Sequence, residues 1–176
     1  DGGMGQELRA RGLNPDAKNA GQALINSPEL VQKVHEEFIN AGAEIITVWN
    51  YALTKHRLEL SSLADKIDKM TRIAVEMANK ARKQAGNSNV QIAGCLPPLR
   101  ESYQTNDQEF NSMVDEYNEI AGYLAPGVDL FLCETMSSAR EAAAAAAAAS
   151  RFGKPVWVSW TLRDEADGLL RSGETL

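Results

Sequence analysis

The sequence predicts an α/β fold with parallel strands, because helix and strand signals alternate along it and the strand segments are apolar on successive residues. Such strands are typical of a sheet that is covered on both faces. The glycine-rich start, residues 1–5, lacks the Gly-x-Gly-x-x-Gly spacing of a nucleotide-binding doubly wound sheet, and no Walker lysine follows it. We therefore expect a parallel (β/α)8 barrel of the TIM type.

Four helices are expected from their caps and apolar stripes. The first begins at Ser27-Pro28, a capping side chain followed by proline, and ends near Gly42. The second covers about residues 63–85. The capping-box spacing of residues 105–108 predicts the start of the third, and that of residues 138–141 predicts the fourth, which carries eight consecutive alanines.

Four strands are expected to alternate with these helices. They cover residues 45–48, 90–95, 128–133 and 156–162, and Asp1–Gly3 is interpreted as the end of an earlier strand. A complete barrel takes about 250 residues, so the chain would hold roughly the first five of eight units. We expect residues 1–176 to be a single domain, the N-terminal part of a barrel whose remaining units lie outside this sequence.

Composition narrows the range of partners. The formal net charge of −6 disfavours nucleic-acid binding, since no global positive field attracts phosphates. The sequence has neither a long apolar run nor a signal-peptide pattern at its start, so we expect a cytoplasmic protein without a membrane partner. Cys95 and Cys133 lie in separate apolar segments, which favours buried inert thiols over a disulfide or a metal site.

Functional groups of a barrel lie at the carboxyl ends of its strands and in the loops that follow. Glu134 comes directly after an apolar segment, so we expect its carboxylate at the mouth of the barrel, with Asp1 as its companion. The two carboxylates would act as an acid and base pair, or would bind the ammonium group of an amino acid. Equally compatible with position alone, Glu134 caps or ion-pairs with a neighbouring loop and Asp1 is a frayed terminus.

Other candidate side chains favour structural roles. The aromatic residues near the strand ends are Trp49, Tyr51, Trp157 and Trp160. Such side chains more often pack than contact a ligand, and Trp157 and Trp160 would face opposite sides of a strand. His35 and His56 have no partner at a metal-binding spacing, so we expect neither to be a ligand.

Several segments carry a resemblance to a known family. They are Asp1–Leu8, Pro28–His35, Ala41–Thr47, Ala93–Leu99 with Glu101–Tyr103, Val128–Met136 and Pro155–Ser159. In this order they resemble the homocysteine S-methyltransferases over nearly the whole sequence. The resemblance implies a barrel that transfers a methyl group to the sulfur of homocysteine and so makes methionine.

The resemblance also implies site residues. Asp1, Gly2 and Glu134 match positions that hold the amino-acid part of homocysteine in the family, and we add Trp49 and Tyr51 as substrate-binding candidates. In the family, zinc held by three cysteines lowers the pKa of the substrate thiol and presents a thiolate. Those cysteines would lie beyond Leu176, and Cys95 and Cys133 do not match them. No metal ligand and no catalytic residue is therefore assigned within this sequence.

The sequence departs from the family at three places. Gln6 stands where the family commonly has threonine, Trp49 where many members have asparagine, and Asn19-Ala20 where Trp-Ser is usual. The Leu-Pro-Pro and Ser-Tyr segments are similar to members that use S-methylmethionine or S-adenosylmethionine. We therefore expect a sulfonium donor and homocysteine as small-molecule partners, with the oligomeric state left open.

Two alternatives belong to other functional classes. A barrel lyase or aldolase of small carboxylic acids would use Glu134 as a general base, and would have no cysteine cluster beyond residue 176. A non-catalytic fragment or scaffold would close its sheet against another chain and would bind neither zinc nor homocysteine.

Overall fold

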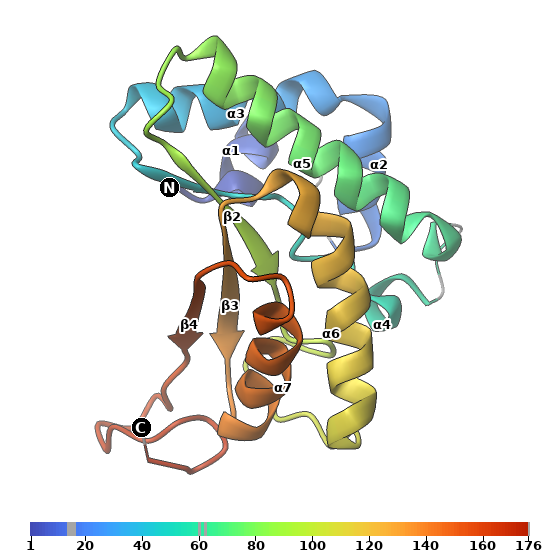
Figure 1. Cartoon of the computed structure of the whole chain (residues 1–176), viewed down its shortest axis with the longest axis vertical. Helices are drawn as coiled ribbons and strands as arrows, with labels where there is room; N and C mark the ends of the chain where they lie inside the picture. Colours follow the sequence, from blue (N-terminus) through green and yellow to red (C-terminus); the bar gives the residue numbers. More distant parts are fainter. Residues whose placement is uncertain (14–16, 60, 62, 176) are drawn as a thin grey trace.

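The computed structural model of the protein describes residues 1–13, 17–59, 61 and 63–175. Its strands form one parallel sheet with helices packed along one face (Figure 1). The strands are β1 (Ile45–Thr47), β2 (Gln91–Leu96), β3 (Leu130–Met136) and β4 (Val156–Trp160). The predicted parallel α/β fold is therefore confirmed, although β3 begins two residues later than expected and ends three residues later.

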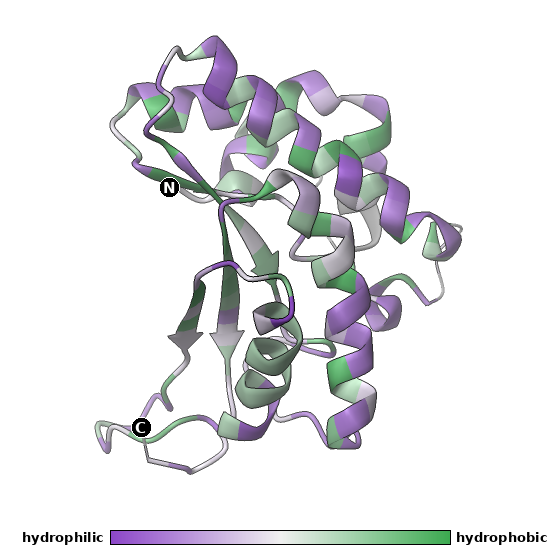
Figure 2. Ribbon diagram, viewed as in Figure 1, coloured by the Kyte–Doolittle hydropathy of each residue, from purple (hydrophilic) through white to green (hydrophobic). Residues whose placement is uncertain are grey.

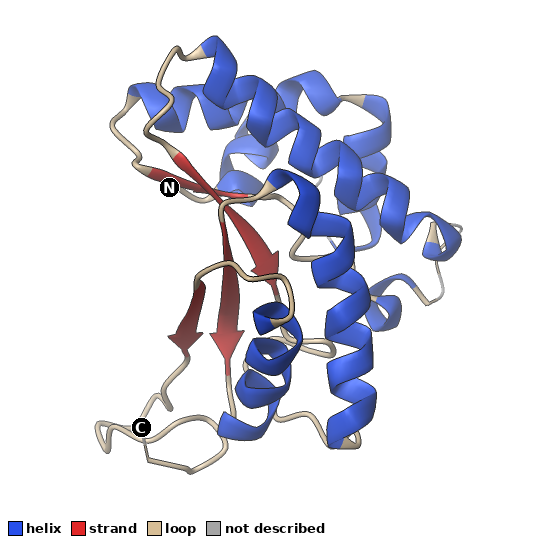
Figure 3. Ribbon diagram, viewed as in Figure 1, coloured by secondary structure: helices blue, strands red, loops and turns tan. Residues whose placement is uncertain are grey.

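The strands lie in the sheet in the same order as in the sequence, β1-β2-β3-β4. Thr47 pairs with Ala93, Ala93 with Leu130, and Cys133 with Val158. In a doubly wound sheet the strand order reverses at a switch point and helices cover both faces. Here each strand lies beside its successor and the helices lie on one side (Figure 3), which is the arrangement of consecutive units in a barrel wall.

The described residues contain more helices than the sequence predicts. They are α1 (Met4–Ala10), α2 (Ala17–Asn26), α3 (Pro28–Asn40), α4 (Lys55–Leu58), α5 (Ile67–Gln84), α6 (Phe110–Leu124) and α7 (Ala139–Ser150), with single 3₁₀ turns η1 (Ala64–Lys66) and η2 (Ala125–Gly127). The expected starts of α3 and α7 are confirmed. Helices α1, α2 and α4 were not expected, and none of the described helices is long and apolar enough to cross a membrane.

The two predicted capping boxes have different outcomes. The Ser138 hydroxyl accepts a hydrogen bond from the Glu141 backbone N–H at 3.3 Å, as expected for the start of α7. The predicted helix start at residues 105–108 is wrong, because α6 begins only at Phe110 and has no side-chain cap. The Asn106 amide oxygen accepts from the Gln108 backbone N–H at 3.0 Å, which holds this stretch in a non-helical turn.

The expected strand end at Asp1–Gly3 is also wrong. These residues are irregular and lead directly into α1. The side chain of Asp1, rather than a strand backbone, accepts the hydrogen bond from the Thr47 backbone N–H at 2.7 Å. Gly2 lies against α3, where an added Cβ would come within 2.5 Å of the Phe38 ring, so a larger residue here would have to displace that ring.

The apolar core lies between the sheet and the helices. Its helical part comes from the inward stripes of α3, α5, α6 and α7, while polar residues lie on the outer faces of α3, α5 and α6 (Figure 2). In α7 the inward residues are Ala142, Ala144, Ala145, Ala148 and Ala149, all buried. These small side chains let α7 pack closely against α6 and β3, so the alanine run forms an ordered helix, as predicted.

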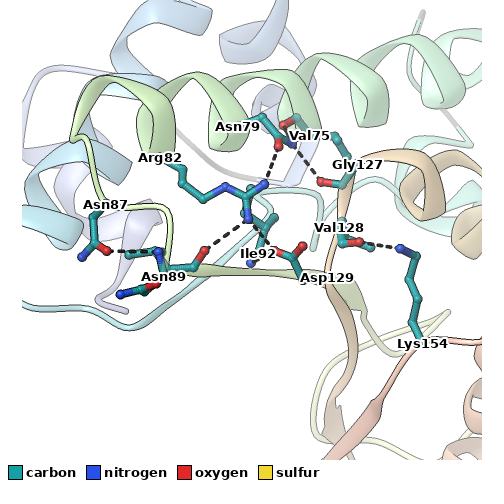
Figure 4. Close-up of polar contacts among 11 residues, drawn as sticks. Val75, Asn79, Arg82, Asn87, Asn89, Ile92, Gly127, Val128, Asp129 and Lys154 are labelled. Atoms are coloured by element: carbon teal, nitrogen blue, oxygen red, sulfur yellow. Dashed lines mark hydrogen bonds and ion pairs between the residues drawn. The ribbon is translucent and has the colours of Figure 1, made fainter.

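A polar network fixes α5 to the amino-terminal ends of the strands (Figure 4). Arg82 donates to a carboxylate oxygen of Asp129 at 2.6 Å and to the backbone oxygen of Val90 at 3.2 Å. The same Asp129 oxygen accepts from the Ile92 backbone N–H at 2.8 Å. In α/β barrels this end of the sheet serves stability, while the opposite end carries function.

Candidate functional site

Polar side chains gather at the carboxyl ends of β1, β2 and β3. The Cys95 thiol on β2 donates a hydrogen bond to Glu134 Oε2 on β3 at 3.0 Å. The side-chain amide of Asn50, just after β1, donates to the backbone oxygen of Cys95 at 2.8 Å. Cys95, which is wholly buried, therefore contacts both the loop after β1 and the neighbouring strand β3.

The sequence predicted that Glu134 comes directly after its strand. In the structure Glu134 lies inside β3. Cys133 pairs with Val158 and Met136 with Trp160, so β3 carries one extra residue between these pairs. This is the signature of a β-bulge, a feature that re-aims side chains near functional sites. The apolar pattern ends at Cys133 although the strand continues, which explains the misplaced end.

The bulge contains an uncommon backbone conformation. Thr135 has a φ of 62°, in the left-handed region that β-branched residues rarely adopt. Such a residue costs about 1–3 kcal/mol and persists only where its surroundings impose it, most often at functional sites. The strained residue directly follows Glu134, so the backbone that aims this carboxylate is held in place by its neighbours.

Asp1 is anchored rather than frayed. One carboxylate oxygen accepts from the Thr47 backbone N–H at 2.7 Å, and the other lies 3.4 Å from the Thr47 hydroxyl oxygen. This contradicts the interpretation of Asp1 as a loose terminus. Asp1 and Glu134 make no direct contact within the described residues, so they are not a pair of carboxyl groups that share a proton.

A second polar cluster joins the loops that follow β1 and β2. The hydroxyl oxygens of Tyr51 and Ser102 lie 2.8 Å apart, and Arg57 donates to the Ser102 hydroxyl at 3.0 Å. The Arg57 guanidinium also stacks 4.9 Å from the centre of the Tyr51 ring. Burial, in the first place, raises the pKa of Tyr51, so its hydroxyl keeps its proton.

Arg57 belongs to this cluster, although the sequence did not predict it. Its backbone N–H donates to the Thr54 hydroxyl at 3.3 Å, the N-cap of α4. Thr54, a residue type that favours the N-cap position, is a sequence signal that could have indicated this short helix. Trp49, by contrast, is half-buried and packs against the apolar core. Of the other departures, Gln6 is exposed on α1, and the side chain of Asn19 lies outside the described part of the structure.

Glu141 fixes the loop between β2 and α6 from beneath. One buried carboxylate oxygen accepts from the Leu99 backbone N–H and from the Asn106 side-chain amide, each at 3.0 Å, and from the Tyr117 hydroxyl at 3.2 Å. Burial and the nearby Glu141 raise the pKa of Tyr117 well above its ordinary value. From the sequence, Glu141 was expected only as part of a helix cap.

The two thiols are poor metal ligands. Burial, followed by the charge of Glu134, raises the pKa of Cys95 well above its ordinary value, and burial raises the pKa of Cys133 to about 12. A thiol binds zinc as the thiolate, which both environments disfavour. The described residues also contain no group of three or more His, Cys, Asp or Glu side chains arranged around a metal position. They therefore do not fit the zinc site that the family resemblance implies.

The sequence is similar to those of known homocysteine S-methyltransferases. The homocysteine S-methyltransferase from Escherichia coli is 29% identical over 181 residues, which cover 93% of this chain and 58% of that protein. Betaine–homocysteine S-methyltransferase 1 from Rattus norvegicus is 25% identical over 171 residues, which cover 95% of this chain and 41% of that protein. The chain therefore spans about half the length of these relatives.

A solved structure has a similar fold. The homocysteine methyltransferase MmuM from Escherichia coli, in its metallated form, superposes with a TM-score of 0.86 at 27% identity. The match covers 99% of this chain and 66% of MmuM. The family model for homocysteine S-methyltransferase matches residues 1–176. Because the whole sequence fits this model, the chain belongs to the homocysteine S-methyltransferase family.

Proposed function

We propose that the chain forms the amino-acid-binding part of an enzyme that moves a methyl group from a sulfonium donor, S-methylmethionine or S-adenosylmethionine, to the sulfur of homocysteine, giving methionine. One observation carries this proposal. Within the described residues, Glu134 has the neutral Cys95 thiol as its hydrogen-bond partner and forms no ion pair. A carboxylate in this position has capacity left for a cationic ligand group such as an ammonium.

We further propose that residues 1–176 are the N-terminal part of a closed (β/α)8 barrel. The sequential strand order and the one-sided helices support this, as does the match to about two-thirds of MmuM. Both outer strands, β1 and β4, carry an unpaired edge in the described residues, and further strands would cover these edges. The exposed Trp157, on β4, would then become part of the interior.

The described residues have separate roles in this proposal. Glu134 binds the ammonium group of homocysteine, and Asp1 with Gly2 completes the amino-acid site beside β1. Tyr51 lines the mouth, where its retained proton makes it a hydrogen-bond donor. Trp49 is the candidate with the least support, because its ring packs on the core.

In this proposal, residues 1–176 supply no zinc ligand. The cysteine ligands of zinc would follow Leu176, and Cys95 and Cys133 would keep their protons. The contribution of residues 1–176 is therefore to bind and orient homocysteine. A cytoplasmic location, where both small-molecule partners would be available, is part of the same proposal.

The test compares Glu134→Gln with wild type in the full-length protein. The intact mass and the zinc content are measured first, followed by methyl transfer from each donor to homocysteine. We expect about one zinc ion per chain on a mass well above 19.2 kDa. The variant loses the charge that binds the ammonium, so its KM for homocysteine rises about 10-fold or more.

Glu76→Gln is the matched control, because this carboxylate is exposed on α5 and forms an ion pair with Lys80 on the same helix. It should leave the KM unchanged. Wild-type protein that binds no zinc and transfers no methyl group from either donor would refute the proposal. Release of a fragment from a carboxylic acid without any donor would instead favour the lyase, in which Glu134 is a general base.

A further inference from the structure

We propose that Cys95 is a positioning residue, whose thiol proton holds the Glu134 carboxylate in the orientation that receives the substrate's ammonium group. This inference rests on the proposed function and adds to it a residue that acts through Glu134 and does not touch the reacting atoms. The observation behind it is the contact of 3.0 Å between Cys95 Sγ and Glu134 Oε2, which joins neighbouring strands.

The strand register places the two side chains on the same face. Cys95 pairs with Leu132, and Glu134 follows Leu132 by two residues along β3. Side chains two apart in a strand share a face, so Glu134 is the diagonal neighbour of Cys95. The contact therefore follows from the register of β2 against β3 and does not depend on a loop conformation.

The thiol acts as a hydrogen-bond donor in this contact. Burial raises the pKa of Cys95 and the proximity of Glu134 raises it further, so the sulfur keeps its proton. A carboxylate only accepts, so the proton points from sulfur to Oε2. The hydrogen bond occupies one oxygen of Glu134 and leaves the other available to a ligand.

Cys95 is itself held in place. The Asn50 side-chain amide donates to its backbone oxygen at 2.8 Å, and Asn50 is almost fully buried. The Val48 backbone N–H donates to Ala93, two residues earlier on β2, at 2.8 Å. A thiol on such a fixed backbone limits the rotation of the Glu134 carboxylate, although a thiol is a weak donor.

Cys133 provides a matched control. It is a buried thiol on the neighbouring strand, packed into the apolar core, and no polar partner is recorded for its sulfur among the described residues. Truncation of either cysteine to alanine removes the same sulfur atom from a buried position. Only the change at Cys95 removes a hydrogen bond to Glu134.

The experiment measures binding by the full-length protein of two ligands, homocysteine and 4-mercaptobutyrate, which lacks the amino group. Calorimetry gives both Kd values, and initial rates give kcat and KM. We expect Cys95→Ala to weaken homocysteine binding about 3- to 10-fold, the usual effect of one lost hydrogen bond, with 4-mercaptobutyrate binding and kcat unchanged. Cys95→Ser, which keeps a donor, restores homocysteine binding, and Cys133→Ala leaves the ratio of the two affinities at the wild-type value.

Equal weakening of both ligands by Cys95→Ala would overturn the inference, since it would show a packing defect. Failure of Cys95→Ser to restore binding would overturn it too. If Cys95→Ala folds poorly, Cys95→Val fills the volume without a donor and takes its place. Wild-type protein that binds both ligands equally would refute the ammonium site itself, a failure of the proposed function that is visible before any variant is compared.

Discussion

Glu141, at the start of α7, accepts a hydrogen bond at 3.0 Å from the side chain of Asn106, which lies 35 residues earlier in the chain. Through this contact and the one with the Leu99 backbone N–H, a buried carboxylate on α7 binds two points of the loop between β2 and α6. That loop carries Ser102, whose hydroxyl oxygen lies 2.8 Å from that of Tyr51. We therefore expect the contact between Ser102 and Tyr51 to depend on Glu141, a side chain that is almost fully buried.

Replacement of Glu141 tests this dependence. Glu141→Ala leaves the Leu99 backbone N–H and the Asn106 amide without their shared acceptor, so the free energy of unfolding falls by about 3 kcal/mol. Glu141→Gln keeps one oxygen and loses about 1 kcal/mol. Urea denaturation measures both values.

Glu76→Ala, at an exposed position of α5, is the control and should change stability by less than about 0.5 kcal/mol. Equal losses in Glu141→Ala and Glu76→Ala would contradict this role.

Replacement of Thr135 should increase the stability of the protein, whereas replacement of Glu141 should decrease it. The φ of 62° at Thr135 is unfavourable for a β-branched residue, and Thr135→Gly removes this strain. The greater freedom of glycine in the unfolded chain offsets part of the gain, so we expect a net increase in stability of about 0.5–1 kcal/mol. Thermal unfolding provides the measurement. Thr105→Gly, at a residue without positive φ, serves as the control and should not stabilise. Equal changes in stability in the two variants would contradict the strain at Thr135.

Replacement of Arg82 should lower the stability of the protein without weakening the binding of homocysteine. Arg82→Ala removes the hydrogen bonds to Asp129 and Val90 at the amino-terminal ends of the strands (Figure 4). Both partners of the ion pair are partly exposed to solvent, which limits the cost to about 1–2 kcal/mol. Chemical denaturation measures this cost, and the KM for homocysteine should remain at the wild-type value. A large rise in that KM would show that this end of the sheet also shapes the site.

Local sequence signals predicted the parts of the fold that depend on neighbouring residues. The proline after Ser27 marks the start of α3, and the spacing from Ser138 to Glu141 marks the start of α7. The similar spacing after Thr105 failed because Asn106 accepts from the Gln108 backbone N–H in a turn and also donates to Glu141, a contact between distant parts of the chain. Helix propensity cannot register such a contact.

The candidate site was predicted less completely for the same reason. Glu134 was identified from the apolar run before it, but the bulge at Thr135 hid the true end of β3. The pairing of Cys95 with Glu134 depends on the register between two strands, which the pattern of either strand alone does not contain. Arg57 reaches Ser102 across two loops, so its position too depends on tertiary structure.

Protonation of His35 should make the stability of the protein depend on pH. His35 is wholly buried on α3, neither ring nitrogen has a hydrogen-bond partner within the described residues, and burial lowers its pKa from 6.5 to about 4. Below pH 6.5 the unfolded chain binds a proton at this residue that the folded chain cannot bind, so stability falls as the pH decreases towards 4. By pH 4.5 the loss from this one group reaches about 2–3 kcal/mol.

The measurement compares the free energy of unfolding at pH 7 and pH 4.5 in wild type and in His35→Leu. The variant lacks the titrating ring, so the difference in stability between the two proteins should shift in favour of the variant by about 2–3 kcal/mol at the lower pH. His56→Gln is the control, because this histidine is partly exposed on α4 and lies 3.4 Å from the carboxylate of Glu101. Carboxylates elsewhere titrate equally in all three proteins and cancel in the comparison. A difference between wild type and His35→Leu that stays constant with pH would mean that His35 takes up its proton in the folded state.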